Sequence, residues 1–267
     1  MIPDPAIVAT VRSGKPLVHH ITNYVTVNDC ANACICCGGS PVMADAAEEM
    51  EAMASIASAL VLNIGTLNAR TLESMEIAGR SANRADVPVL LDPVGVGATG
   101  FRTESVKRIL DRVEVAVVKG NHGEIGVLSG TGGDVRGVDS GGAEDPAAAS
   151  ETLSSELGCV VAATGEKDYV SSGGRTVELS NGHPLLERVS GTGCMLSSVV
   201  GAYIGACGPS VDTVGTAITV FNLSAECAAE RSAGPGTFKP ALMDALGSFE
   251  PGRLCSARVR ELRLRAS

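Results

Sequence analysis

The sequence has no apolar run of the ~18–20 residues that a helix needs to cross a bilayer, and no basic segment leading into an apolar stretch at its start. We therefore expect neither a membrane span nor a secretory signal peptide. Basic residues are also in deficit, because 21 lysines and arginines stand against 30 aspartates and glutamates, a net charge of −9. Nucleic acid is excluded as the main partner, since binding it needs clustered basic side chains. The one basic run, RVRELRLRAS at residues 258–267, is expected to be a solvated tail.

Aromatic side chains make up only 3% of the sequence, with no tryptophan. Little aromatic surface is available to stack on a flat heterocycle, so such a ring would be held by aliphatic packing. The common nucleotide-binding loops are missing as well. No lysine in the sequence is preceded by the glycine spacing of a P-loop. GVGATG at residues 95–100 satisfies G-x-G-x-x-G, but it lies mid-chain and lacks a strand-ending acid at the expected distance, which argues against a dinucleotide site.

Cysteine, by contrast, is plentiful, with nine residues. Because no secretory signal is expected, we predict free thiols in a reducing, cytoplasmic setting. Cys30, Cys34, Cys36 and Cys37 crowd together, and three of them recur at the i, i+4, i+7 spacing of one helix face. Cysteine behaves there as a small apolar side chain, whereas structural zinc sites use two separated pairs. We predict core packing. A non-catalytic metal- or redox-sensing protein is the alternative from another functional class.

Short apolar runs alternate with helical patterns through most of the chain. The strand-like runs are PLVHHIT, SPVMA, ALVLNIG, VPVLLDPV, EVAVVKG and CVVAATG. They lack polar alternation, which predicts an α/β fold with a mostly parallel sheet covered by helices on both faces. DYVSSGGRTVELSNG is typical of an antiparallel hairpin at one edge, and helices are predicted at 25–37, 46–57, 193–206, 210–231 and 237–248. The glycine-rich stretch 129–146 is only a loop's length, so we predict one domain over residues 1–267.

Polar or glycine residues follow several of these strands. They are Asn63-Ile64-Gly65, Asp92-Pro93-Val94-Gly95, Lys119-Gly120-Asn121 and Thr164-Gly165-Glu166. In an open parallel sheet, ligands bind beyond the carboxyl ends of the strands. We therefore expect these residues to converge on one rim of the sheet and to form a binding site there.

Three features at this rim fit phosphoryl transfer. Asp92 ends an apolar strand, where a carboxylate is costly unless it is paired or meets a metal. Glu124 closes an N-x-x-E step after another strand and could hold Mg²⁺ or its waters, although a capped, solvated acid fits equally. The run 191–194, Gly-Thr-Gly-Cys, opens an apolar helix, and glycines there let the first-turn N–H groups approach an anion. An ordinary cap with close packing is the alternative. Carboxylates for a metal beside an anion hole indicate phosphoryl transfer.

Eight ordered blocks, which run nearly end to end, carry a family resemblance: HHITNYVTVNDCAN, GGSPVMADAAEEM, LNIGTL, LDPVGVGAT, VKGNHGEI, ATGEKDYV, GTGCMLSSVVGAY and GPGTFKPALMDAL. The chain resembles the hydroxyethylthiazole kinase family of the ribokinase-like superfamily. The resemblance implies a ribokinase-like fold, MgATP as the donor, and phosphorylation of 4-methyl-5-(2-hydroxyethyl)thiazole at its hydroxyl in thiamine biosynthesis and salvage. It also implies a homotrimer with the thiazole bound near a subunit interface.

The resemblance assigns roles to seven binding positions: Met43 and Gly191 for the thiazole with Asn23 nearby, Lys119 and Thr164 for ATP, and Asp92 and Glu124 around magnesium. Lys119 stands where the family often has arginine. A lysine meets phosphate as a point charge rather than as a fork, so the affinity for the nucleotide is the property that this departure affects.

Cys194 stands where many superfamily relatives have an aspartate base. A helix N-terminus can lower the pKa of a thiol, so we expect Cys194 to orient the substrate hydroxyl or to accept its proton. The N–H groups from Gly191 through Gly193 to Cys194 would hold the transferring phosphoryl group. A covalent phosphocysteine and a mere space-filling role are the alternatives for this residue.

Two further expectations concern the substrate and two adjacent histidines. Within the kinases, the runner-up substrate is another small alcohol such as a hydroxymethylpyrimidine. His19 and His20, near the end of the first predicted strand, are expected to be hydrogen-bonded structural residues rather than part of the site.

Overall fold

The computed structural model describes residues 2–132, 135–136, 139–140 and 145–263. Its helices are α1 (Pro5–Gly14), α2 (Val27–Cys37), α3 (Met50–Ile56), α4 (Ala69–Arg84), α5 (Gly100–Leu110), α6 (His122–Leu128), α7 (Pro146–Leu157), α8 (Thr192–Cys207), α9 (Val211–Glu230) and α10 (Pro235–Gly247). Its strands are β1 (Leu17–Ile21), β2 (Ser40–Val42), β3 (Ala59–Asn63), β4 (Val89–Asp92), β5 (Val117–Asn121), β6 (Val135–Arg136), β7 (Asp139–Ser140), β8 (Val160–Thr164), β9 (Asp168–Ser172), β10 (Arg175–Leu179) and β11 (Val259–Leu262). Short 3₁₀ turns occur at Ala47–Glu49, Pro184–Leu186 and Pro251–Ser256.

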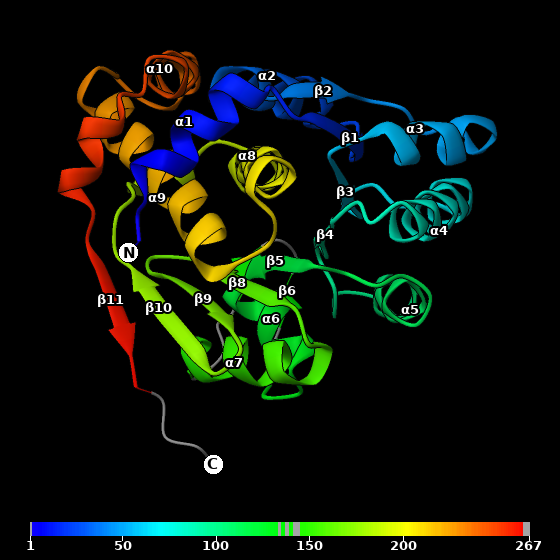
Figure 1. Cartoon of the computed structure of the whole chain (residues 1–267). Helices are drawn as coiled ribbons and strands as arrows, with labels where there is room; N and C mark the ends of the chain where they lie inside the picture. The colour runs from blue at the N-terminus through cyan, green and yellow to red at the C-terminus, as the bar shows by residue number, and fades with distance from the viewer. Residues whose placement is uncertain (1, 133–134, 137–138, 141–144, 264–267) are drawn as a thin grey trace.

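Nine of the described strands form one sheet in the order β11-β10-β9-β8-β5-β4-β3-β1-β2 (Figure 1). The strands from β2 to β8 in this order pair in parallel, and β9, β10 and β11 add an antiparallel edge. The register places Asn63 opposite Asp92 and Asn121 opposite Thr164. Both the convergence of polar strand ends on one rim and the antiparallel hairpin are thus confirmed.

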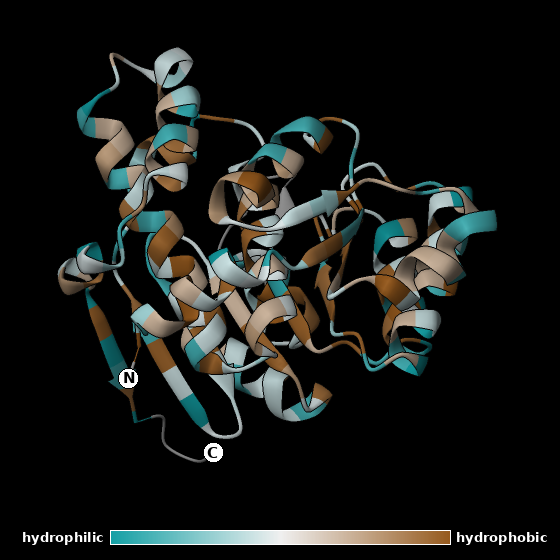
Figure 2. Cartoon of the chain, turned by 45° about the horizontal axis from the view of Figure 1, so that its top comes forward, coloured by the Kyte–Doolittle hydropathy of each residue, from teal (hydrophilic) through white to brown (hydrophobic). Residues whose placement is uncertain are grey.

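Side chains of the central strands alternate between two cores. On β3, Ala59 and Val61 pack into one core, whereas Leu60 and Leu62 pack into the other. Residues of α1, α2, α8, α9 and α10 complete the first core, and residues of α3 to α7 complete the second. Figure 2 shows brown, apolar strands between helices with teal, polar outer sides. The predicted α/β fold, with helices on both faces of a mostly parallel sheet, is confirmed.

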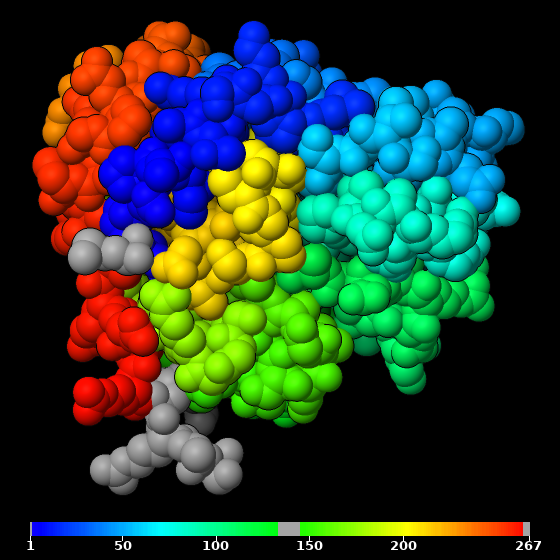
Figure 3. Space-filling model, in the orientation of Figure 1, coloured from blue at the N-terminus to red at the C-terminus, as the bar shows by residue number. Residues whose placement is uncertain are grey.

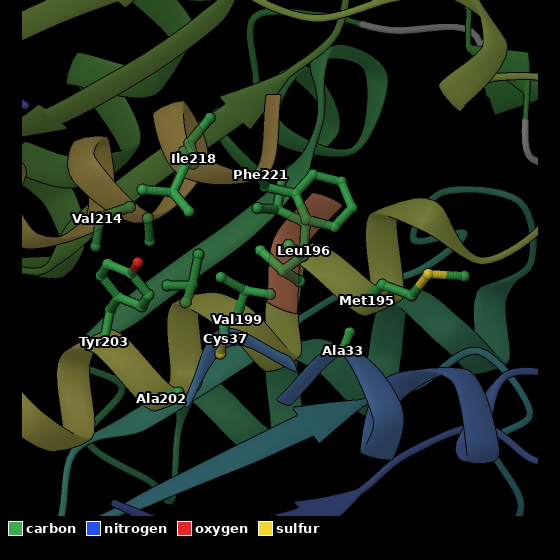
Figure 4. Close-up of a cluster of buried hydrophobic side chains, with 14 of the residues drawn as sticks. Ala33, Cys37, Met195, Leu196, Val199, Ala202, Tyr203, Val214, Ile218 and Phe221 are labelled. Atoms are coloured by element: carbon green, nitrogen blue, oxygen red, sulfur yellow. The ribbon is translucent and has the colours of Figure 1, made fainter. Parts of the chain in front are cut away.

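Helix α8 is buried along most of its length and carries the predicted site at its start. Its apolar side chains meet those of α2 and α9 in one cluster, as Figure 4 shows for Leu196, Val199 and Tyr203 of α8 and for Ile218 and Phe221 of α9. Gly201 lets the helix lie directly on the sheet, because a Cβ there would be only 2.6 Å from Val61 Cγ2. This packing fixes where the first turn of α8 stands.

The cysteine cluster belongs to the first core. Cys30, Cys34 and Cys37 lie buried on one face of α2, and burial raises the pKa of the Cys37 thiol to about 12. All nine cysteines are free thiols. The predicted core packing is confirmed, and in the described part of the chain no three His, Cys, Asp or Glu side chains are grouped to hold a metal ion.

Three predictions differ from the structure. The C-terminal run is not a solvated tail over Val259–Leu262, because these residues form β11 against β10, where Arg260 Nη2 lies 2.9 Å from Glu178 Oε2; residues 264–267 lie outside the described residues. The helix predicted at 46–57 begins as a 3₁₀ turn, and α3 starts only at Met50. The stretch 129–146 contains the unpredicted pair β6–β7 and otherwise lies partly outside the described residues.

The helix predictions at 25–37, 193–206, 210–231 and 237–248 agree with α2, α8, α9 and α10 to within about two residues at each end. None of the helices in the described ranges is both long enough and apolar enough to cross a membrane.

Candidate active site

A cavity of about 590 Å³ opens at the carboxyl ends of the central strands, beside the start of α8. Seven of the nine predicted site residues line it: Asp92, Lys119, Glu124, Thr164, Gly191, Gly193 and Cys194. They come from β4, β5, α6, β8 and α8, so the rim expected from the strand ends is a real concave site.

Gly191 lets the chain turn sharply into α8. Its φ is +87°, a left-handed backbone conformation that favours glycine, and a Cβ at this position would collide with the side chain of Thr26. Among the described side chains none caps this helix, and residues 190–194 line the cavity. The first-turn N–H groups, which have no partner inside the helix, therefore belong to residues at the cavity wall, where an anion-binding helix start would need them.

Asp92 lies at the floor of the cavity and is fully buried. Its Oδ2 accepts hydrogen bonds from Asn63 Nδ2 at 2.8 Å and from Ser197 Oγ at 2.7 Å. Lys119 Nζ is 3.8 Å from the same oxygen. Burying a carboxylate at this strand end costs free energy, as expected from the sequence, and the two hydrogen-bond donors and the nearby cation offset that cost.

Lys119 reaches across the cavity floor from β5 to the start of α8, where its Nζ donates to the Gly193 carbonyl at 3.0 Å. Burial works against its charge, but the carboxylates of Asp92 and Glu124 and the sulfur of Cys194 outweigh burial and raise the pKa of Lys119. The residue is therefore a fixed ammonium ion next to the start of α8.

Glu124 is both a helix cap and a wall of the cavity. Its Oε2 accepts from the Asn121 backbone N–H at 2.8 Å in a capping box, and its Oε1 accepts from the Gly95 N–H at 2.8 Å. The predicted cap exists, but the acid is buried rather than solvated. Burial and the neighbouring charge of Asp92 raise the pKa of Glu124, a repulsion that a bound cation would relieve.

The pKa of the Cys194 thiol differs from the value expected from the sequence. Its Sγ accepts hydrogen bonds from Asn23 Nδ2 and Asn63 Nδ2, each at 3.3 Å. Burial, together with the charge of Asp92, raises the pKa of Cys194 to about 11 instead of lowering it. The expectation of a lowered pKa at the helix start was wrong because the sulfur is largely shielded from water.

This shift gives a direct prediction. With a pKa of about 11, only ~1% of the Cys194 thiol is ionised at pH 9, and the thiolate is the nucleophile. Alkylation of Cys194 by iodoacetamide, followed by peptide mass spectrometry, should still be rising steeply between pH 9 and 10. Exposed Cys255 provides the reference rate in the same digest. A plateau below pH 8.5 would contradict the structure.

The far end of the cavity contains residues that sequence reasoning missed. Asp168 accepts from the Gly165 N–H at 3.0 Å through Oδ1 and from Asn222 Nδ2 at 2.7 Å through Oδ2. Burial raises the pKa of Asp168 to about 6. These bonds fix the loop after Thr164, whose Oγ1 donates to the Gly120 carbonyl at 3.2 Å. The available signal was a lone asparagine in the apolar helix ITVFNLSA.

Two predicted site residues do not line the cavity. Asn23 contacts the cavity-lining Cys194 through a hydrogen bond from its Nδ2. Met43 follows the edge strand β2, half-buried. The structure therefore brings the residues predicted for phosphoryl transfer together and places Met43 apart from them.

The two histidines are structural, as predicted. His19 Nε2 is 3.0 Å from the Ala44 carbonyl oxygen, and His20 Nδ1 is 3.0 Å from the Val18 carbonyl oxygen. Burial is the main cause that lowers the pKa of both side chains, so both are neutral at physiological pH.

Comparison with known proteins agrees with this geometry. Residues 8–251 match the Hydroxyethylthiazole kinase family. The chain is 51% identical to the hydroxyethylthiazole kinase of Methanoculleus marisnigri over 257 residues, 96% of this chain and 92% of that protein. The structure of hydroxyethylthiazole kinase from Pyrococcus horikoshii superimposes with a TM-score of 0.89 at 42% identity, covering 96% of this chain and 98% of that one. A ribokinase-like superfamily protein of Enterococcus faecalis, 14% identical, shares the fold with a TM-score of 0.65 over 91% of this chain and 94% of that one.

Proposed function

The chain belongs to the hydroxyethylthiazole kinase family, and on that premise we propose how its residues divide the work of the reaction. It phosphorylates the hydroxyethyl side chain of a thiazole in thiamine salvage, with ATP as the phosphoryl donor. The arrangement at the cavity floor supports these roles. An uncapped helix start, a buried lysine and two carboxylates lie together there.

The transferring phosphoryl group is proposed to lie against the start of α8. Residues 190–194 line the cavity there, and Lys119 Nζ already donates to the Gly193 carbonyl at 3.0 Å. In a loose transition state, charge spreads over the phosphoryl oxygens, so preorganised donors and a fixed cation lower the barrier.

Asp92 and Glu124 are the proposed magnesium residues. Within the described chain, both hydrogen bonds to the Asp92 carboxylate are accepted by Oδ2, which leaves Oδ1 for a further partner. Glu124 already accepts one N–H at each oxygen. Mg²⁺ keeps several waters and takes one or two carboxylates plus substrate phosphates, so this donor pair fits it. The ion would neutralise charge on the phosphates.

Cys194 is proposed to hold the substrate hydroxyl. As the hydroxyl oxygen forms its bond to the γ-phosphorus, the bond from that phosphorus to the oxygen of ADP breaks, and the hydroxyl proton passes to the sulfur of ionised Cys194, whose own proton has gone to solvent beforehand. Proton loss is late in a loose transition state, so a weakly ionised thiol is sufficient to assist.

The nucleotide is proposed to lie along the loop after Thr164, which Asp168 and Asn222 fix. The apolar side chains of the cavity lining include Leu186, Val189 and Leu196, and Phe221 contributes an aromatic ring. We expect the base to be held by apolar packing, with loose discrimination among nucleotides.

The thiazole itself is proposed to bind near a subunit interface of a homotrimer. Met43 lies at the edge of the sheet, outside the cavity of its own chain. Tyr24 and Val25, in the loop after β1, are 78% and 62% exposed, and exposed apolar side chains mark interaction sites. A neighbouring chain would close the site over this loop.

We further propose that residues 1–267 form a single domain and that the protein works in a reducing, cytoplasmic setting.

The role of Met43 can be tested by substitution. Met43→Ala should weaken thiazole binding by about 1–2 kcal/mol, because it removes a large apolar side chain from the proposed ring contact. The dissociation constant for ATP should hardly change, since Met43 does not line the cavity. Isothermal titration with each ligand measures both. An unchanged thiazole dissociation constant would place Met43 in the protein interior alone.

The function itself is tested by ATP-dependent conversion of the thiazole alcohol, with the product identified by mass. A hydroxymethylpyrimidine serves as the competing alcohol, and we expect kcat/KM to favour the thiazole. A preference for the pyrimidine would replace the substrate assignment and leave the phosphoryl site in place.

A further inference from the structure

The sulfur of Cys194 accepts from two side chains, and both present an amide nitrogen to it. Asn23 reaches it from the loop after β1, and Asn63 reaches it from the end of β3; each Nδ2 is 3.3 Å from Sγ. Both asparagines are almost fully buried. The roles transferred from the family include no function for Asn63, and they place Asn23 only near the thiazole.

The orientation of both amides follows from their other partners. The Asn23 Oδ1 accepts from the backbone N–H of Thr26 at 3.1 Å and from its Oγ1 at 3.0 Å. The Asn63 Oδ1 accepts from Gly65 N–H at 2.9 Å and from Asn23 Nδ2 at 3.0 Å. With both oxygens filled by donors, the groups that face the sulfur must be NH₂.

The donors of Asn63 link two parts of the site. One N–H goes to Asp92 Oδ2 at 2.8 Å, and the other goes to Cys194. The backbone also leaves room for the pair, because a Cβ at Gly65 would lie 2.9 Å from Asn23 Cβ and 3.0 Å from Asn63 Oδ1. The two amides therefore have one arrangement, with every donor and acceptor used.

Two N–H donors fill the two lone pairs of a neutral thiol. A substrate hydroxyl can therefore donate to this sulfur only when Cys194 is ionised, because the thiolate has a third lone pair. Hydrogen bonds to a charged acceptor are stronger than those to a neutral one, so the amides favour this form.

We infer that Asn23 and Asn63 are positioning residues that clamp the sulfur of Cys194 as an acceptor and support the negative charge with which it takes the hydroxyl proton. This inference rests on the proposed role of Cys194 in the kinase reaction. The hydroxyl oxygen gains the phosphoryl group, ADP leaves, and the proton goes from the hydroxyl to the sulfur and from there to solvent.

The first test uses Asn23→Asp and needs no substrate. The carboxylate keeps the acceptors for Thr26 but removes both donors. We expect iodoacetamide to alkylate Cys194 about tenfold more slowly at one fixed pH, because a charge-assisted hydrogen bond is lost. Exposed Cys255 is the internal reference, and Asn83→Asp is the matched control, because the Asn83 side chain bonds to the backbone of Glu114 through both its amide oxygen and its amide nitrogen. A merely structural role would loosen the site and speed alkylation. An unchanged or faster rate in the folded variant overturns the inference.

The second test is a double-mutant cycle on turnover. Asn23→Asp should lower kcat about tenfold in the wild-type background and less than about twofold in Cys194→Ala, since the clamp acts through the sulfur. Equal losses in both backgrounds would overturn the inference.

Gly65→Ala displaces both asparagines without removing a polar atom, so it should also slow alkylation of Cys194. This variant replaces Asn23→Asp if the latter does not fold. A chain that fails to phosphorylate the thiazole would remove the proposed function, whereas the alkylation result would stand by itself.

Discussion

Asp92→Asn is expected to lower kcat by about 10²–10³-fold, because a metal ion and fixed charges at a phosphoryl group contribute several kcal/mol to the barrier. The amide keeps an oxygen that can accept from Asn63 and Ser197, so the hydrogen bonds at the end of β4 remain possible. What is lost is the negative charge that faces Lys119 and the proposed magnesium ion. The loss should also raise the Mg²⁺ concentration needed for half-maximal activity.

The measurement is kcat as a function of total Mg²⁺ at saturating ATP, with the melting temperature as the check on folding. Asp111→Asn is the matched control, because Asp111 lies exposed at the end of α5 and does not line the cavity. Wild-type turnover with wild-type magnesium dependence in the Asp92 variant would remove Asp92 from the metal site.

Cys194→Ser is expected to lower kcat by about 10–100-fold, with a smaller change in KM, in the low range of general acid–base effects. A serine hydroxyl is far less acidic than a thiol, so it gives up its own proton less readily and then accepts the substrate proton less often. Cys194→Asp should retain substantial activity, because a carboxylate is a competent proton acceptor of similar reach. Its activity should also be less dependent on pH above 7, where the carboxylate is already ionised.

The competing role for Cys194 is a covalent phosphocysteine. It predicts an almost inactive Asp variant and a phosphorylated wild-type enzyme during turnover. Steady-state kcat for both variants, with intact-mass analysis of the wild type while it turns over, distinguishes the two roles. A trapped adduct of one phosphoryl group would overturn the proton-acceptor assignment.

The cavity rim at the strand ends was predictable because its signals are local. A charged or amide residue at the end of an apolar strand is visible in the sequence, and parallel pairing brings such ends together whatever the order of the strands. Asp92 and Lys119 were found in this way. Asn63 was visible as a strand end too, but its task depends on which way its amide faces, and this is set by Gly65 and Asn23 across the sheet.

Other parts depend on contacts that one chain segment cannot reveal. Asp168 and Asn222 are 54 positions apart and become partners only when α9 packs against the hairpin. Strand β11 was missed because its arginines resemble a solvated tail, although charged side chains are what an exposed edge strand carries. Burial likewise reversed the expected shift of the Cys194 pKa. The sequence of a helix's first turn does not reveal how much water will reach its side chains.

The division of the sheet between two cores also sets the order in which the molecule can be assembled during synthesis. Strands β1, β3, β4 and β5, with α3 to α6 on one face, have all been made by residue 128. The opposite face at Val61 and Leu90 is completed with α8 and α9 (Figure 3, where these yellow segments lie between blue and green ones). A nascent chain therefore exposes an apolar sheet face until residue 192 and beyond, which is a surface that chaperones bind and that aggregates at high concentration. Asp92 is translated about a hundred residues before Cys194, and the cavity that both residues line is complete only once the last third of the chain has been made.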